Sequence, residues 1–160
     1  MVKVGDAKTI VFANVEIPKA NPESVPLKSD FKSGDAIFCR IFFGKTFGDY
    51  VKESKAVSYA YRLYADGEKY AYFHSKFWNI DADQAGWVGF QDELTAKGAG
   101  AKFDALGKGK HTIEMKVYFY VPNPNKQYTG EVTGKGLEVR DSSGTVDGPI
   151  AATGKFTYTV

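Results

Sequence analysis

A turn sequence between two alternating runs constrains the fold of this chain most strongly. Asp66-Gly67 separates Lys55–Tyr64 from Tyr70–Trp78, and apolar and polar side chains alternate in both runs. Alternation with a period of two is typical of β-strands, and a tight hairpin turn needs residues that accept a positive φ, as Asp-Gly does. We therefore predict a β-hairpin here. A shift of one residue in its register would exchange its buried and exposed faces.

The rest of the chain has the same strand-and-turn character. Aromatic residues make up 15% of the chain and there are 17 glycines, a composition that suits pleated strands joined by tight turns. Six further strands are predicted, over Thr9–Glu16, Ala36–Phe43, Trp87–Gln91, His111–Val121, Glu131–Val139 and Pro149–Val160. In His111–Val121, the alternating set Ile113, Met115, Val117, Phe119 and Val121 is expected to face the core.

The segments between these strands predict loops, with one exception. Three prolines within Pro18–Pro26 exclude both a helix and a central strand. A loop carrying Phe47 and Tyr50 is expected after Gly44, and another over Asp141–Gly148. The exception is Ala101–Gly107, which favours a short turn of helix that ends at its glycine.

These elements predict an all-β fold of about eight strands in a single domain over residues 1–160. The favoured architecture is an antiparallel β-sandwich, immunoglobulin-like or jelly-roll, with one short helical turn. A closed barrel of lipocalin type has a suitable length and strand number and stays open as an alternative. A chain of 160 residues can form a hydrophobic core without a disulfide or a metal.

Charge and composition argue against several classes of partner. The formal net charge is +2, and the basic residues are scattered among acidic ones, so no concentrated face for nucleic acid is expected. No apolar stretch is long enough for a transmembrane helix. Cys39 lies within an apolar strand and is interpreted as a buried small hydrophobe. Export to the periplasm or cell exterior is favoured if a leader has been removed.

Catalytic and metal chemistry have little support in the sequence. The two histidines, His74 and His111, have no serine elbow or orienting acid nearby, so we expect neither an enzyme nor a cofactor. Asn79, Asp81 and Asp83 place oxygen ligands at alternate positions, as calcium loops do. Because the flanking segments resemble strands rather than helices, a turn that satisfies its own backbone is favoured over this calcium site.

Aromatic residues give the main functional lead. One face of the second hairpin strand carries a row of rings, with another ring in the following loop, and we predict these as ligand-binding residues: Tyr70, Tyr72, His74, Trp78 and Trp87. Such rings offer a large contact area with polar edges, suited to a protein or a carbohydrate. Burial in the core is the competing interpretation. It is favoured for Phe73 and Phe77 and left open for the tyrosines of this hairpin strand.

The sequence thus predicts a non-catalytic binding or structural module, exported or surface-associated, that binds through an aromatic strand face and its loops. One alternative is a carrier with an internal apolar pocket lined by Tyr61, Phe73, Val117 and Phe119. A carbohydrate-binding module is the second alternative. A homo-oligomer is also considered, formed through an unprotected sheet edge at Thr153–Val160, although burial of that strand inside the sheet is slightly favoured.

Overall fold

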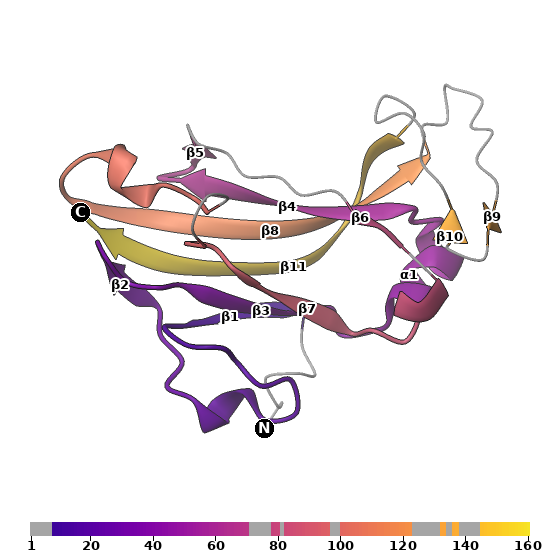
Figure 1. Cartoon of the computed structure of the whole chain (residues 1–160). Helices are drawn as coiled ribbons and strands as arrows, with labels where there is room; N and C mark the ends of the chain where they lie inside the picture. Colours follow the sequence, from indigo (N-terminus) through magenta and orange to yellow (C-terminus); the bar gives the residue numbers. More distant parts are fainter. Residues whose placement is uncertain are drawn as a thin grey trace.

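The computed structural model describes residues 8–70, 78–80, 82–96, 100–122, 132–133, 136–137 and 145–160. These residues contain a nine-stranded sheet with the strand order β5-β4-β8-β11-β1-β3-β7, in which β2 also pairs with β11 and β6 with β4 (Figure 1). Its strands are β1 (Thr9–Ala13), β2 (Asp30–Lys32), β3 (Phe38–Phe42), β4 (Ser58–Ala65), β5 (Glu68–Lys69), β6 (Trp78–Asn79), β7 (Gly89–Glu93), β8 (Lys110–Pro122) and β11 (Thr145–Thr159). β9 (Val132–Thr133) and β10 (Gly136–Leu137) pair separately, where one strand over Glu131–Val139 was predicted.

The predicted hairpin is confirmed. β4 and β5 are antiparallel, and the two residues between them, Asp66 and Gly67, have φ values of 52° and 85°. Both lie in the left-handed region, as a two-residue type I′ turn requires. β6 returns to the same strand, with Trp78 opposite Tyr59. Residues 71–77 of the predicted second strand lie outside the described residues.

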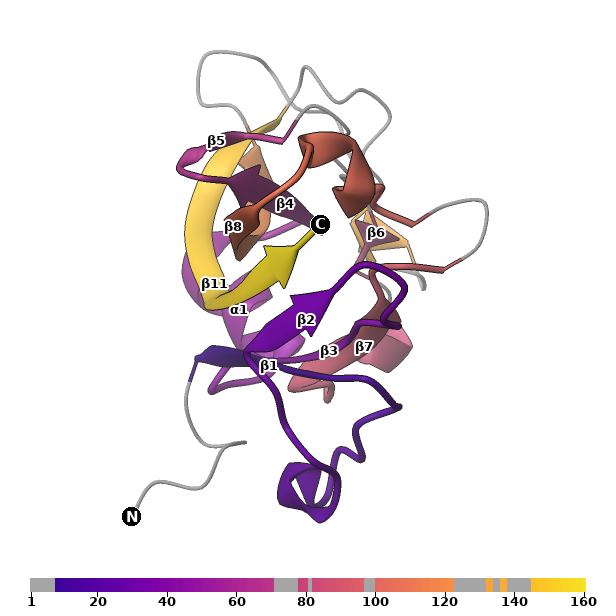
Figure 2. The ribbon, with the colours of Figure 1, turned by 90° about the vertical axis from the view of Figure 1, so that its left-hand side faces the viewer.

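The all-β prediction holds, but the sheet is not an antiparallel sandwich. β11 runs antiparallel to β8 along most of its length and parallel to both β1 and β2, so the sheet is mixed. Figure 2 shows that the sheet curls, with β4, β8 and β11 on one side of the interior and β1, β3 and β7 on the other. The described strands therefore form a half-barrel, and no hydrogen-bonded ladder among them joins β4 to β7 as a closed lipocalin-type barrel would require.

Side chains connect the two ends of this curled sheet. The Tyr61 hydroxyl on β4 donates a hydrogen bond to Asp92 of β7 over 2.8 Å. The rings of Tyr59 and Phe90 lie 5.3 Å apart between the same two strands. The inner face of the sheet thus packs against itself, and a second sheet is not needed to cover these strands.

The position of β11 confirms the slightly favoured burial of Thr153–Val160 inside the sheet and contradicts the unprotected sheet edge that was considered there. This segment lies between β8 on one side and β1 and β2 on the other, so its backbone groups are paired within the chain. Gly154 allows the close approach of β1, because a Cβ there would lie 2.7 Å from the Cβ of Ile10. The strand also begins earlier than predicted, since Thr145–Gly148 belongs to it rather than to a loop.

The core lies on the concave face and is rich in aromatic rings. The predicted alternation of β8 is confirmed for Ile113, Met115, Val117 and Phe119, which are all buried. The Phe119 ring stacks on Tyr50, with ring centroids 4.1 Å apart. Cys39 is buried in the same cluster, as predicted.

The loop predicted after Gly44 is wrong, because this segment contains helix α1 (Phe47–Ser54). Thr46 and Asp49 form a capping box, in which each side chain accepts a hydrogen bond from the other residue's backbone N–H. The helix ends at Lys55, whose φ of 57° is left-handed. Burial of Phe47 and Tyr50 holds the helix against one end of the core.

Three short 3₁₀ turns complete the described chain: η2 (Pro22–Ser24), η3 (Ala82–Gln84) and η4 (Phe103–Leu106). η2 lies within the proline-rich loop predicted at Pro18–Pro26. η4 confirms the predicted helical turn, and Gly107, with a φ of 91°, ends it as expected.

Candidate functional site

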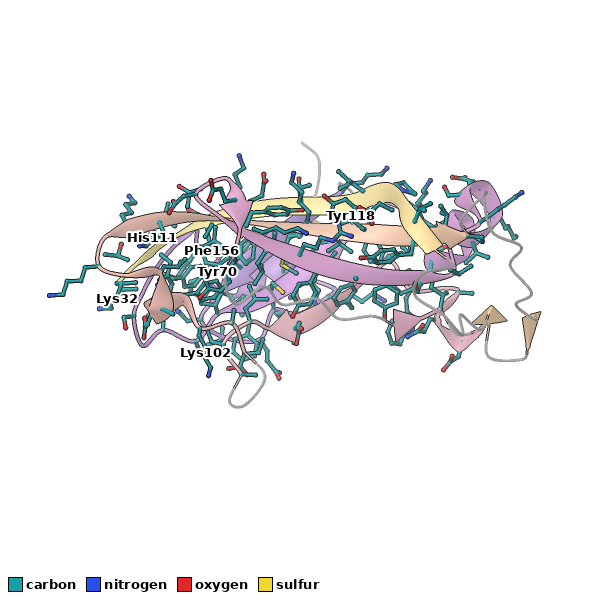
Figure 3. The ribbon with its side chains drawn as sticks, turned by 90° about the horizontal axis from the view of Figure 1, so that it is seen from above. Lys32, Tyr70, Lys102, His111, Tyr118 and Phe156 are labelled. Carbon is teal, nitrogen blue, oxygen red and sulfur yellow. The ribbon has the colours of Figure 1, made fainter. Side chains whose placement is uncertain are left out.

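Among the predicted ligand-binding residues, the structure describes the side chains of Tyr70 and Trp87, and these two do not share an exposed face. Tyr70 is only 3% exposed; its hydroxyl donates a hydrogen bond to the Lys102 carbonyl and its ring stacks on Phe103. Figure 3 shows Tyr70 beside Lys102 and Phe156 at one end of the sheet. Tyr70 is therefore a core residue: it follows β5, its backbone N–H donates a hydrogen bond to the Leu63 carbonyl, and its ring packs against η4.

The other predicted aromatic residues do not join Tyr70. Tyr72 and His74 lie outside the described residues, and Trp78 is described only through its backbone pairing with Tyr59. Trp87 is 43% exposed and lies next to α1, where its ring centroid is 6.3 Å from that of Phe47. In Figure 1, α1 and η4 lie at opposite ends of the sheet, so Trp87 and Tyr70 cannot share one site.

The calcium candidate remains a prediction. Asp81 lies outside the described residues, and only the backbone of Asn79 is described. Asp83 lies exposed in η3. The described residues bring together no group of three or more acidic, histidine or cysteine side chains able to hold a metal ion.

A different set of tyrosines shares the outer face of β4, β8 and β11. Side chains alternate between the two faces of a strand, so directly opposite residues of neighbouring strands share a face. The register sets Tyr118 between Ala60 of β4 and Ile150 of β11, and Tyr120 between Ser58 and Asp147. With the neighbouring side chains of β4, these form what we call the tyrosine face: Arg62, Tyr64, Tyr118, Tyr120, Asp147 and Ile150.

Arg62 organises the tyrosine face. Its guanidinium donates hydrogen bonds of 2.8 and 2.6 Å to the two carboxylate oxygens of Asp147, and one of 2.9 Å to the Tyr120 hydroxyl. The same guanidinium lies over the Tyr118 ring, 4.5 Å from its centroid. A bidentate pair of this kind fixes the arginine in one orientation.

A second cation, the Lys116 amine, lies over another ring of the tyrosine face. The Lys116 amine lies 5.1 Å from the centroid of the Tyr64 ring. The hydroxyls of Tyr64 and Tyr118 are 3.5 Å apart, so the two phenols are in hydrogen-bond contact. Lys116 thus contacts the Tyr64 ring and Arg62 contacts the Tyr118 ring, and the two tyrosine hydroxyls join these cation–π pairs.

These contacts fix the protonation states of the face near neutral pH. The hydrogen bonds with Asp147 raise the pKa of Arg62, and the same bonds lower the pKa of Asp147. Burial, followed by the hydrogen bond with Tyr64, raises the pKa of Tyr118 to about 12. Arg62 and Asp147 thus stay charged and Tyr118 stays a neutral phenol.

Apolar surface adjoins these polar groups. Ile150 of β11, which the register sets opposite Tyr118, is 44% exposed although it lies in the sheet. Tyr64 and Tyr118 are half-buried, whereas Tyr120 lies deeper, beneath Arg62. The face therefore combines a fixed charge pair, phenol hydroxyls and one exposed aliphatic side chain within three adjacent strands.

The concave interior has a different character. Tyr61, Val117 and Phe119, expected to line an internal pocket, are buried in the packed core, and Phe73 lies outside the described residues. This packing favours a surface site over an internal ligand. The described residues include no helix that is both long and apolar enough to cross a membrane.

The alternation predicted for His111–Val121 implies that Tyr118 and Tyr120 lie opposite its core-facing set, but it could not place Arg62 beside them. That contact depends on the pairing of β4 with β8, two strands separated by more than forty residues in the chain. A search of protein-family models, of curated proteins and of solved structures found no match to this chain.

Proposed function

We propose that this protein is a non-catalytic binding module that contacts a partner protein through the tyrosine face. The observation that carries the proposal is the fixed Arg62 among Tyr64, Tyr118 and Tyr120, next to the exposed Ile150. Tyrosine and arginine are enriched among the residues that contribute most to protein–protein binding. An exposed aliphatic side chain beside them adds apolar area that a partner would bury.

The coverage of the ring faces favours a protein over a carbohydrate. A sugar ring stacks on the open face of an aromatic side chain. Here the Arg62 guanidinium lies over Tyr118 and the Lys116 amine over Tyr64. Hydroxyl edges and cations are what the face presents outward, and these groups suit the polar and charged side chains of a protein partner.

Preorganisation supports binding at this face. Ordering a long side chain costs about 0.5–1.5 kcal/mol on association. Arg62 is already held by Asp147 and Tyr120 before any partner arrives. A partner would therefore meet an arginine that has lost little freedom on binding.

The protonation states support a binding role over catalysis at this face. A general acid or base works best when its pKa lies near the working pH. The pKa of Tyr118 is raised to about 12 and that of Asp147 is lowered, so neither group exchanges protons readily near neutrality.

The proposal is tested with immobilised wild-type protein and two variants, Arg62→Ala and Tyr118→Ala, exposed to an extract of the source organism. Quantitative mass spectrometry should find proteins that the wild type retains and both variants lose. Lys52→Ala, which removes a cation from exposed helix α1, is the control and should retain the same proteins. Circular dichroism first verifies that each variant is folded. Equal retention by the wild type and both tyrosine-face variants would contradict the proposal.

A further inference from the structure

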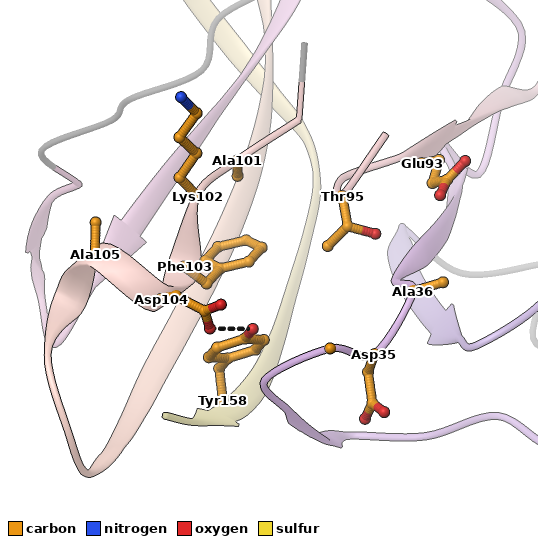
Figure 4. Close-up of a pocket in the computed structure, with 11 residues that line it drawn as sticks. Asp35, Ala36, Glu93, Thr95, Ala101, Lys102, Phe103, Asp104, Ala105 and Tyr158 are labelled. Carbon is orange, nitrogen blue, oxygen red and sulfur yellow. Dashed lines mark hydrogen bonds between the residues drawn. The ribbon is translucent and has the colours of Figure 1, made fainter. Parts of the chain in front are cut away.

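A cleft lies at the end of the sheet where β11 ends, away from the tyrosine face. Its volume is about 620 Å³, within the range of pockets that bind small molecules. Figure 4 shows Phe103, Asp104 and Tyr158 on one wall and Thr95, Ala36 and Glu93 on the other. The cleft thus lies between η4 with β11 and the segment that follows β7.

The wall formed by η4 is held in place by aromatic contacts. The Phe103 ring stacks on Tyr70 at 5.5 Å and meets Phe156 edge-on at 5.7 Å. Thr95 anchors the opposite wall, because its hydroxyl accepts a hydrogen bond of 2.9 Å from the Ile37 N–H. Small lining residues such as Ala36 and Ala101 leave the space between the walls open. The cleft is therefore a preformed feature of the fold.

The charged side chains of the cleft are mostly carboxylates. Asp104 accepts a hydrogen bond of 2.7 Å from the Tyr158 hydroxyl through its Oδ1 atom. Asp35 accepts a hydrogen bond from the Lys32 N–H and lies 3.9 Å from the Lys28 amine. Among the described residues, by contrast, no ion pair involves either Asp104 or Glu93.

Lys102 is the basic residue that lines the cleft, opposed to three acidic residues. Figure 4 shows its amine pointing away from the hydrogen-bonded pair of Asp104 and Tyr158. Carboxylates with low-dielectric walls on both sides attract cations and repel anions. The cleft is thus negative in charge and partly apolar in its lining.

We infer that this cleft binds a small organic cation, with an ammonium group at the Asp104 carboxylate and its hydrocarbon body against Ala36 and Ala101. Oδ1 of Asp104 already bonds Tyr158, so the tyrosine orients the carboxylate and leaves Oδ2 for the ligand. Glu93 on the opposite wall adds negative charge at the other side of the same opening. This inference is independent of the tyrosine face and of the function proposed for it.

The test compares two probes of the same length, 1,5-diaminopentane and 1,5-pentanediol, by isothermal calorimetry and by amide chemical shifts of the isotope-labelled full chain. The diamine is expected to bind and to shift the amides of Thr95 and of residues 101–105. The diol, which has no charge, is expected to bind at least about tenfold more weakly, because it lacks charge-assisted hydrogen bonds. Equal binding of both probes, or shifts at other residues, would overturn the inference.

Two variants, Asp104→Asn and Glu93→Gln, test whether the diamine binds at the carboxylates of the cleft. Each removes one charge but keeps the shape, and the asparagine retains an oxygen that can accept the Tyr158 hydrogen bond. Diamine binding is expected to weaken about tenfold in Asp104→Asn and by a smaller factor in Glu93→Gln.

The matched control is Glu23→Gln, which removes the same charge from an exposed residue of η2 outside the cleft and should leave binding unchanged. A loss in the control equal to that in Asp104→Asn would show a general charge effect and overturn the inference. Arg62→Ala should bind the diamine normally, so failure of the tyrosine-face proposal would leave this result intact.

Discussion

Replacement of Tyr61 by phenylalanine tests whether a single hydrogen bond helps to hold the curl of the sheet. Tyr61 is 1% exposed, and its hydroxyl donates to Asp92 over 2.8 Å. The two residues belong to β4 and β7, which lie near opposite ends of the strand order. The substitution removes the hydroxyl and keeps the ring, so the packing of this ring in the core is preserved.

The magnitude follows from the nature of the acceptor. A hydrogen bond to a charged group contributes about 1.5–3 kcal/mol, and the substitution leaves the Asp92 carboxylate, which still accepts a hydrogen bond from the Glu93 N–H, with one donor fewer. We therefore expect Tyr61→Phe to lower the free energy of unfolding by about 2 kcal/mol. For a domain of this length the melting temperature should fall by roughly 4–8 °C.

Urea denaturation followed by circular dichroism measures this loss. The control is Tyr64→Phe, which removes the hydroxyl of a half-buried outer tyrosine that lies 3.5 Å from the Tyr118 hydroxyl. Its unfolding free energy should change by less than about 0.5 kcal/mol, as is usual for surface substitutions. Equal losses in the two variants would refute the role given to the bond between Tyr61 and Asp92.

Three further predictions concern the backbone and the pH dependence of stability. Gly89→Ala should lower the free energy of unfolding, measured by urea denaturation, by about 2–3 kcal/mol, because the added Cβ would lie 1.7 Å from the Ile41 carbonyl oxygen. Gly86→Ala, with open space around it, should leave the free energy of unfolding almost unchanged. Equal losses in the two variants would contradict the β3–β7 pairing. Lys55→Gly should stabilise the protein by about 0.5 kcal/mol, since glycine relieves the left-handed end of α1; a loss of stability would argue against that helix end. The hydrogen bond with Asp66 raises the pKa of His111. Protonated His111 therefore contributes its full stabilisation below pH 6.5, and this contribution is lost as the pH rises through the raised pKa. Urea midpoints measured from pH 5.5 to 9 should fall in the wild type relative to His111→Gln, and parallel curves would refute this linkage.

Local sequence patterns predicted the local parts of this structure. The Asp66-Gly67 turn, the alternation of β8 and the glycine end of η4 each depend on residues close together in the chain. The helix α1 was also within reach, because Thr46 and Asp49 have the spacing of a capping box. The apolar residues around Phe47 and the nearby glycines concealed that signal.

Features that depend on distant pairing were not predicted. The parallel neighbours of β11 come from the other end of the chain, and no local pattern specifies which strands flank a given strand. The same limit applies to Tyr70, whose burial requires contact with Phe103. It also applies to Arg62, whose position over Tyr118 follows from the β4–β8 register. Alternation indicates that a strand has two faces, and the pairing decides what each face meets.

The most direct test of the tyrosine face is photo-crosslinking from position 118. A photoreactive phenylalanine analogue replaces Tyr118 in one sample and Glu23, an exposed residue of η2, in the other. In an extract of the source organism, position 118 should form a discrete covalent adduct that excess unlabelled wild-type protein suppresses and excess Arg62→Ala does not. The same adduct from position 23, or equal suppression by both competitors, would contradict binding through the tyrosine face.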